Sequence, residues 1–94
     1  MQELPAIDLL RAEHEFPGPY LFKVIGRAEN GFVARTVAAV RDALEAPVDP
    51  PYTVRESAGG RHVAVSLNAE VRTAGQVLDV YRRVRLLHGL VMCL

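Results

Sequence analysis

Apolar and polar residues alternate with two different periods along this chain. Four runs have the period of two that is typical of β-strands, at residues 20–27, 52–57, 61–68 and 90–94. Residues 31–45, and a second stretch that starts at Thr73, instead repeat apolar side chains at intervals of three and four, as expected of helices that bury one face. The pattern therefore predicts the element order β-α-β-β-α-β.

Turn and cap residues mark the ends of these elements. Thr73 followed three positions later by Gln76 is a capping-box pattern, and Asn30 is the expected N-cap of the first helix. Residues 58–60 contain two glycines and predict a hairpin, and Gly89 is expected to end the second helix. Residues 5–13 fit either a short helix or a frayed terminus, and the pattern does not decide between them.

This element order is that of the ferredoxin-like sandwich, an α+β fold. We expect a four-stranded antiparallel sheet in the order 4-1-3-2, with both helices on one face. Residues 1–94 form one domain, and residues 1–16 are an N-terminal extension. The predicted core joins the stripes of both helices to the inward side chains of two strands: Val33, Val37, Val40, Val77, Tyr81, Val84, Phe22, Val24, Val63 and Val65.

The other face of the sheet is predicted to be open. Alternation places an apolar patch there, with charged residues around it, and such a patch suits a two-fold contact between copies. We therefore predict a homodimer through this face. The predicted interface consists of Leu21, Ile25, Ala64 and Val91, with Cys93 beside it and Lys23, Arg27, Arg55 and His62 around it.

Composition limits the classes of function. Eleven basic and eleven acidic residues cancel, so the chain has no long-range field to attract nucleic acid. The single cysteine forms no internal disulfide, and no signal peptide or apolar stretch of ~18 residues is visible, which favours a cytoplasmic protein that does not cross a membrane. The histidines and Cys93 lack ligand spacing, so no metal or other cofactor is expected.

The turn between the first strand and the first helix is the strongest candidate site. A free helix N-terminus binds carboxylates and phosphates, and a glycine lets a ligand approach it. We expect a small anionic metabolite to bind here, with the alternative that the glycines only allow tight packing. The candidate residues are Gly26, Arg27, Asn30, Gly31, Phe32 and Arg35. No catalytic set is apparent, and the expectation is a regulatory or interaction domain with a small-molecule or protein partner rather than an enzyme.

An enzymatic alternative uses the same turn. Residues 26–35 faintly resemble the anion-binding loop of acylphosphatases, which ends with an arginine, here Arg35. That family also places a water-positioning asparagine on its second strand, and residues 52–57 contain none.

Residues 16–26, 51–62 and 77–92 resemble the YbeD-like family of small bacterial proteins. The segments include Phe-Pro-Gly-Pro-Tyr at residues 16–20 and Glu-Ser-Ala-Gly-Gly at residues 56–60. The resemblance implies a fold similar to ACT-type regulatory domains, and members are often labelled proposed lipoate regulatory proteins. ACT domains bind amino acids beside the glycine of the first strand-to-helix turn, usually at a dimer interface, and Gly31 has the comparable place. Glu29 and Asn30 precede it in place of the usual acidic residue and proline.

Overall fold

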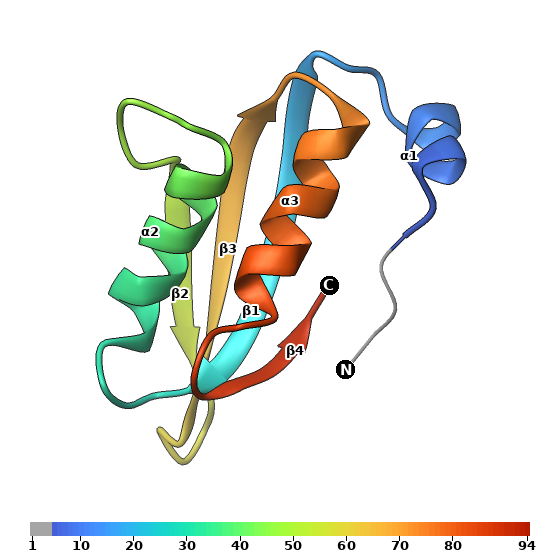
Figure 1. Ribbon diagram of the computed structural model, residues 1–94. Coiled ribbons are helices and arrows are strands. Elements are labelled where there is room, and N and C mark those ends of the chain that lie inside the picture. The colour runs from blue at the N-terminus through green and yellow to red at the C-terminus, as the bar shows by residue number, and fades with distance from the viewer. Residues whose placement is uncertain (1–4) are drawn as a thin grey trace.

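The computed structural model describes residues 5–94, so the first four residues of the predicted N-terminal extension lie outside the described part of the chain. The order within it is α1 (Ile7–Glu13), β1 (Gly18–Arg27), α2 (Phe32–Ala43), β2 (Tyr52–Glu56), β3 (His62–Val71), α3 (Ala74–Val84) and β4 (Leu90–Cys93) (Figure 1). The predicted order is confirmed. The 5–13 stretch contains a helix, and Leu10 anchors it in the core.

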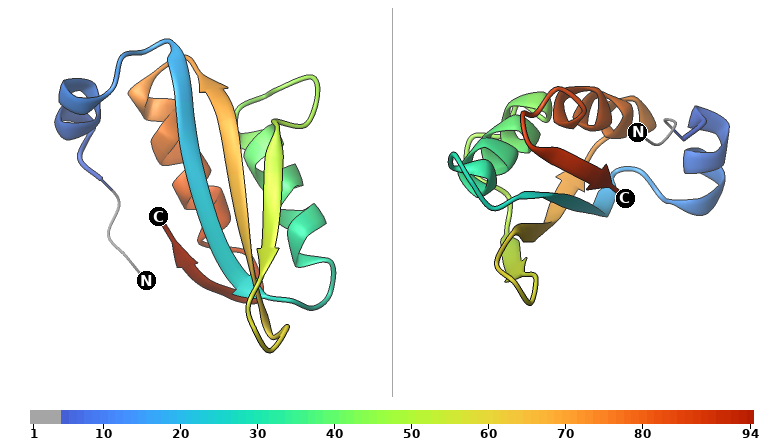
Figure 2. Two further views of the ribbon diagram at one scale, coloured as in Figure 1. Left: turned by 180° about the vertical axis from the view of Figure 1, so that it is seen from behind. Right: turned by 90° about the horizontal axis from the view of Figure 1, so that it is seen from below.

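The strands form one antiparallel sheet in the order β2-β3-β1-β4, which is the predicted order read from the other edge. β1 and β3 form its centre, with an unbroken register from Gly18 opposite Val71 to Arg27 opposite His62. Helices α2 and α3 cover one face, and the view from behind shows the other face without a helix (Figure 2). The predicted α+β sandwich is therefore the observed fold.

The core lies between the two helices and the central strands. Of the predicted core residues, only Val33 is not fully buried. It lies in the first turn of α2, where its half-buried side chain packs against the core and also lines an open pocket next to β2. Tyr20 and Phe22 both pack on the helix side, where the Tyr20 and Tyr81 hydroxyls lie 3.3 Å apart.

The two covering helices begin differently. At α3 the predicted cap is confirmed, because Thr73 Oγ1 accepts a hydrogen bond from the Gln76 N–H at 3.3 Å. At α2 the predicted Asn30 cap is wrong. The N-cap is Gly31, with φ of 66° and no side-chain cap, and Asn30 itself has a positive φ of 54°. The N-terminus of α2 therefore lacks the side-chain oxygen that closes that of α3.

The C-terminal strand contains an irregularity that the alternation pattern did not predict. Val24 pairs with Cys93 and Ile25 with Met92, but Gly26 pairs with Leu90, which leaves Val91 as an extra residue. This β-bulge reverses the expected alternation. Cys93, expected on the open face, is buried on the helix side, and Met92 faces the open side opposite Ile25. Burial raises the pKa of the Cys93 thiol to about 11.

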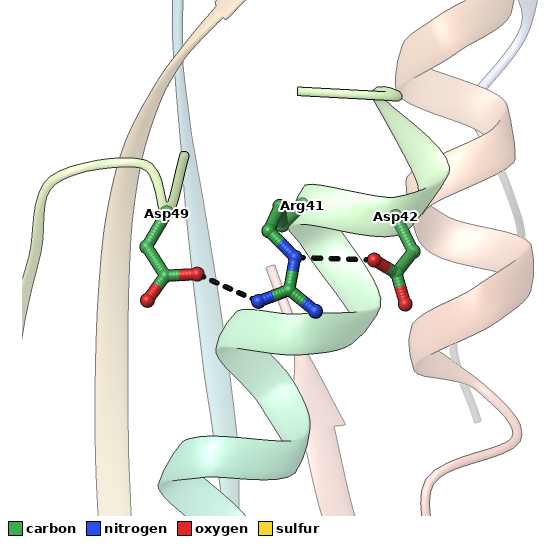
Figure 3. Close-up of polar contacts among 3 residues, drawn as sticks. All are labelled: Arg41, Asp42 and Asp49. Carbon is green, nitrogen blue, oxygen red and sulfur yellow. Dashed lines mark hydrogen bonds and ion pairs between the residues drawn. The ribbon is translucent and has the colours of Figure 1, made fainter. Parts of the chain in front are cut away.

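The link from α2 to β2 is held by one arginine. Arg41 Nε lies 3.1 Å from Asp42 Oδ1, and its Nη1 lies 3.0 Å from Asp49 Oδ1 (Figure 3). Asp42, and then Asp49, raise the pKa of the Arg41 guanidinium. Both pairs are exposed and so contribute little stability, but the second attaches the linker to α2 just before β2 begins.

Candidate functional site

Gly26 and Phe32 are in direct contact across the candidate turn. Phe32 is 2% exposed, and its ring lies where a Cβ on Gly26 would be, well inside van der Waals distance of the ring carbons. Gly26 therefore has no side chain because the ring occupies that space. For this glycine the contact supports the packing alternative. Gly31 is different, since nothing lies within 4 Å of the position of its Cβ.

Arg35 fixes the turn in place. Its Nε donates to the Asn30 carbonyl at 2.9 Å, and its Nη1 donates to the His88 carbonyl at the same distance. The guanidinium also lies over the Phe32 ring, 5.6 Å from the centroid, in a cation–π contact. Its Nη2 is buried without a hydrogen-bond partner among the described residues. Arg35 thus joins the start of α2 to the turn before β4.

Arg27 has different partners. Its side chain is 67% exposed, with Nη1 4.0 Å from Glu29 Oε1, while its backbone N–H donates to the Gly89 carbonyl at 2.9 Å. An ion pair this long and this exposed adds little stability. The Arg35 guanidinium is thus bound to two carbonyls, and that of Arg27 lies exposed beside Glu29.

A pocket of about 360 Å³ opens beside Gly31. It lies between the start of α2 and the edge strand β2, and we call it the Gly31 pocket. Within it the Phe32 N–H donates to the Glu29 carbonyl at 3.2 Å, which closes the turn. Its lining residues are Ala28, Glu29, Asn30, Gly31, Phe32, Val33, Val54, Glu56 and Val63.

The Gly31 pocket combines three kinds of surface. One end is the N-terminus of α2, where the helix dipole and unpaired N–H groups favour negative charge. Glu29 and Glu56 are among the residues that line it, and neither Arg27 nor Arg35 is, although the Glu29 carboxylate lies 4.0 Å from the Arg27 guanidinium. Its wall is apolar and comes from Val33, Val54 and Val63. The pocket can therefore hold a ligand that carries both charges and an apolar part.

Three lining residues were missed at the sequence level. Val54, Glu56 and Val63 lie on strands, and the register places Val54 opposite Val65 and Glu56 opposite Val63, on the helix side of the sheet. The helix side of β2, where Val54 and Glu56 lie, remains exposed because α2 does not extend over this edge strand. The alternation predicted which way they face, but no pattern in the sequence showed where the helix cover would end.

Several predicted site residues thus meet at one turn, although with different roles. Asn30, Gly31 and Phe32 line the Gly31 pocket, whereas Gly26 and Arg35 hold the turn together. The acylphosphatase-like alternative needs an arginine that can reach an anion at this turn. Two nitrogens of Arg35 are bound to carbonyls and the third is buried, so the geometry does not favour that reaction.

The open face presents the predicted interface in part. Leu21 is 61% exposed, Ile25 and Ala64 are half-buried, and Val91 is 52% exposed within the bulge of β4. Met92 takes the position opposite Ile25. Self-association through this face stays a prediction, with Met92 as the β4 residue that faces Ile25.

Two further features were looked for among residues 5–94, a metal cluster and a membrane-spanning helix. No group of three or more histidine, cysteine, aspartate or glutamate side chains lies close enough there to hold a metal ion. Among these residues no helix is both long and apolar enough to cross a membrane.

Comparison with known proteins places the chain in a family. The model of the family described as "Protein of unknown function (DUF493)" matches residues 11–94. The chain belongs to the DUF493 family. Two UPF0250 proteins, from Shewanella sp. strain ANA-3 and Shewanella sp. strain MR-4, are each 31% identical to it over 75 residues. In both cases the match covers 80% of this chain and 83% of the relative.

These matches confirm the resemblance to small bacterial proteins of unknown function. The family description names no activity. The Gly31 pocket brings together a helix N-terminus, two glutamates and three valines.

Proposed function

We propose that this protein is a small regulatory domain that binds an amino-acid-like zwitterion in the Gly31 pocket. The observation that carries the proposal is that two glutamates and three valines line a pocket beside a helix N-terminus without a side-chain cap. The pocket's volume of about 360 Å³ lies within the ~300–1,000 Å³ range of small-molecule sites.

Each part of such a ligand has a matching surface. Its carboxylate accepts hydrogen bonds from N–H groups at the start of α2, near Gly31, where the dipole also favours it. Its ammonium group lies near Glu29 and Glu56, and its side chain packs against the valines. The two glutamates disfavour a ligand that is only anionic, so the proposal narrows the sequence-based expectation to a ligand that carries both charges.

A thermal-shift series tests this proposal. We expect an apolar amino acid at about a hundred times its Kd to add ~2.7 kcal/mol to the free energy of unfolding, which corresponds to a rise in Tm of roughly 10 °C or more. The deaminated acid and the decarboxylated amine of the same side chain should give much smaller shifts, because each lacks one charge. A larger shift from the deaminated acid than from the amino acid would contradict the zwitterion.

The variant Glu56→Gln tests, in the same thermal-shift series, whether Glu56 takes part in binding. This variant should bind the amino acid at least about tenfold more weakly, a loss of ~1.4 kcal/mol. Glu70→Gln makes the same charge change on an exposed residue of β3 that does not line the pocket, and it should bind like the natural protein. Equal shifts in the two variants would show that Glu56 takes no part.

A further inference from the structure

Strand β2 is an unusually accessible edge. It ends the sheet, every one of its residues is exposed, and it pairs with β3 without a bulge. Figure 2 shows the β2–β3 hairpin projecting from the body of the molecule. Edge strands expose unpaired backbone groups. Bulges, lysines or a covering helix or loop usually prevent such strands from pairing with another chain. Tyr52–Glu56 has no bulge and no lysine.

Two hydrogen bonds fix which backbone groups of β2 face outward. At one end the Asn68 N–H donates to the Pro51 carbonyl at 2.9 Å, and at the other the Ser57 N–H donates to the His62 carbonyl at 2.9 Å. The Pro51 carbonyl and the Ser57 N–H therefore point toward β3. Because backbone groups alternate along a strand, Thr53 and Arg55 do so too. The N–H and C=O groups of Tyr52, Val54 and Glu56 point to the free edge.

We propose that two copies of this chain associate through β2, antiparallel, about a two-fold axis at Val54. In this register Val54 faces Val54 of the other copy, and Tyr52 faces the partner's Glu56. The backbone N–H and C=O groups of these residues all point to the free edge. Each opposing pair therefore exchanges two N–H···O=C hydrogen bonds. The outward groups of Tyr52–Glu56 are then all paired, and the two sheets continue as one.

The side chains favour a second copy over an unrelated peptide. The proposed register would place Thr53 opposite the partner's Arg55 and Glu56 opposite the partner's Tyr52, so no like charges would lie directly opposite each other. The two Arg55 residues are only diagonal neighbours, roughly 7–8 Å apart. The side chains of Tyr52 and Val54, each 45% exposed, would be partly buried against the partner on the helix side of the sheet. Such a short strand pair belongs to the small, transient class of interfaces.

The pairing also reaches the Gly31 pocket. Glu56 lines that pocket, and the partner's Tyr52 comes to lie opposite it. Association and the occupancy of the pocket are therefore expected to influence each other, although the pairing itself does not depend on what the pocket binds.

Disulfide trapping tests the register. In Val54→Cys the two introduced residues have Cα atoms about 5.5 Å apart across the axis, within the ~4.4–6.8 Å range of disulfides. In Tyr52→Cys the two copies of that residue are about 14 Å apart, at ~3.4 Å per residue. Under mild oxidation, and at physiological ionic strength, we expect Val54→Cys to form covalent dimers at least tenfold faster than Tyr52→Cys. The natural protein, whose Cys93 is buried, is the negative control and should form no covalent dimer.

The opposite results would overturn the proposal. Equal rates for the two cysteine variants would mean that the disulfides form by random collision. Loss of the Val54→Cys dimer when Ile25→Asp is added, with the fold retained, would show that the contact lies on the open face.

A second measurement needs no cysteine. By sedimentation, Val54→Lys and Val54→Glu should each be monomeric while their mixture dimerises, and failure of the mixture to dimerise would also overturn the pairing.

Discussion

Replacing Gly26 with valine should destabilise the protein by about 3 kcal/mol, at the upper end of what overpacking costs in a core. The added Cβ and methyl groups would occupy the space of the Phe32 ring, which is 2% exposed and covered by Arg35. The ring can move only if the Arg35 bonds to the Asn30 and His88 carbonyls are strained. The free energy of unfolding in urea, with the midpoint and slope compared, measures the loss.

Gly59→Ala is the matched control for this variant. Nothing lies within 4 Å of the position of a Cβ at Gly59, and its φ does not require glycine. Its stability should stay within about 0.5 kcal/mol of the natural protein, or rise slightly. If Gly26→Val were as stable as this control, the contact between Phe32 and Gly26 would not be the reason for the glycine.

Removing the other partner should have an even larger effect. Phe32→Ala is expected to cost about 3–5 kcal/mol, because it removes a buried ring and leaves a cavity above Gly26. It also removes the ring under the Arg35 guanidinium. Chemical unfolding measures this value in the same way.

Combining the two changes tests whether they share one space. The double variant Gly26→Val with Phe32→Ala should lose at least 1 kcal/mol less than the sum of the single losses, since the valine then fills part of the cavity. Strict additivity would show that the two residues do not interact, and would contradict the packing described at the turn.

Much of the fold could be predicted because it depends on local patterns. Alternation in the strands and the stripes of the helices gave the order of elements, and right-handed crossovers then fixed the order of strands in the sheet. Thr73 with Gln76 is a signal contained within four residues, and the cap it predicts is present. These features need no knowledge of what lies opposite them in space.

The errors arose where the outcome depends on distant residues. The bulge at Val91 depends on how β4 meets β1, so alternation alone placed Cys93 on the wrong face. Arg35 was expected to be free for an anion, but its hydrogen bonds go to the carbonyl of His88, 53 positions further along the chain. The cap of α2 fell on Gly31 because both Asn30 and Gly31 adopt positive φ, which a side-chain preference does not reveal.

The candidate site was predicted in the same uneven way. The glycine pattern pointed to a turn that has a pocket beside it, and Asn30, Gly31 and Phe32 line that pocket. Its charge was not foreseen, because Glu56 comes from an edge strand that the sequence did not place beside α2. The proposed ligand differs from the expected anion for this reason.

The central claim is that the Gly31 pocket binds a zwitterion, and a titration followed by amide and methyl chemical shifts tests it most directly. With an apolar amino acid that raises Tm, we predict the largest changes at the Gly31 amide and at the Val54 and Val63 methyl groups, reduced in Glu56→Gln but not in Glu70→Gln. Arg82 and Arg83 in the last turn of α3 form a second place where a carboxylate could bind. Changes there without a change at the Gly31 amide would contradict the claim.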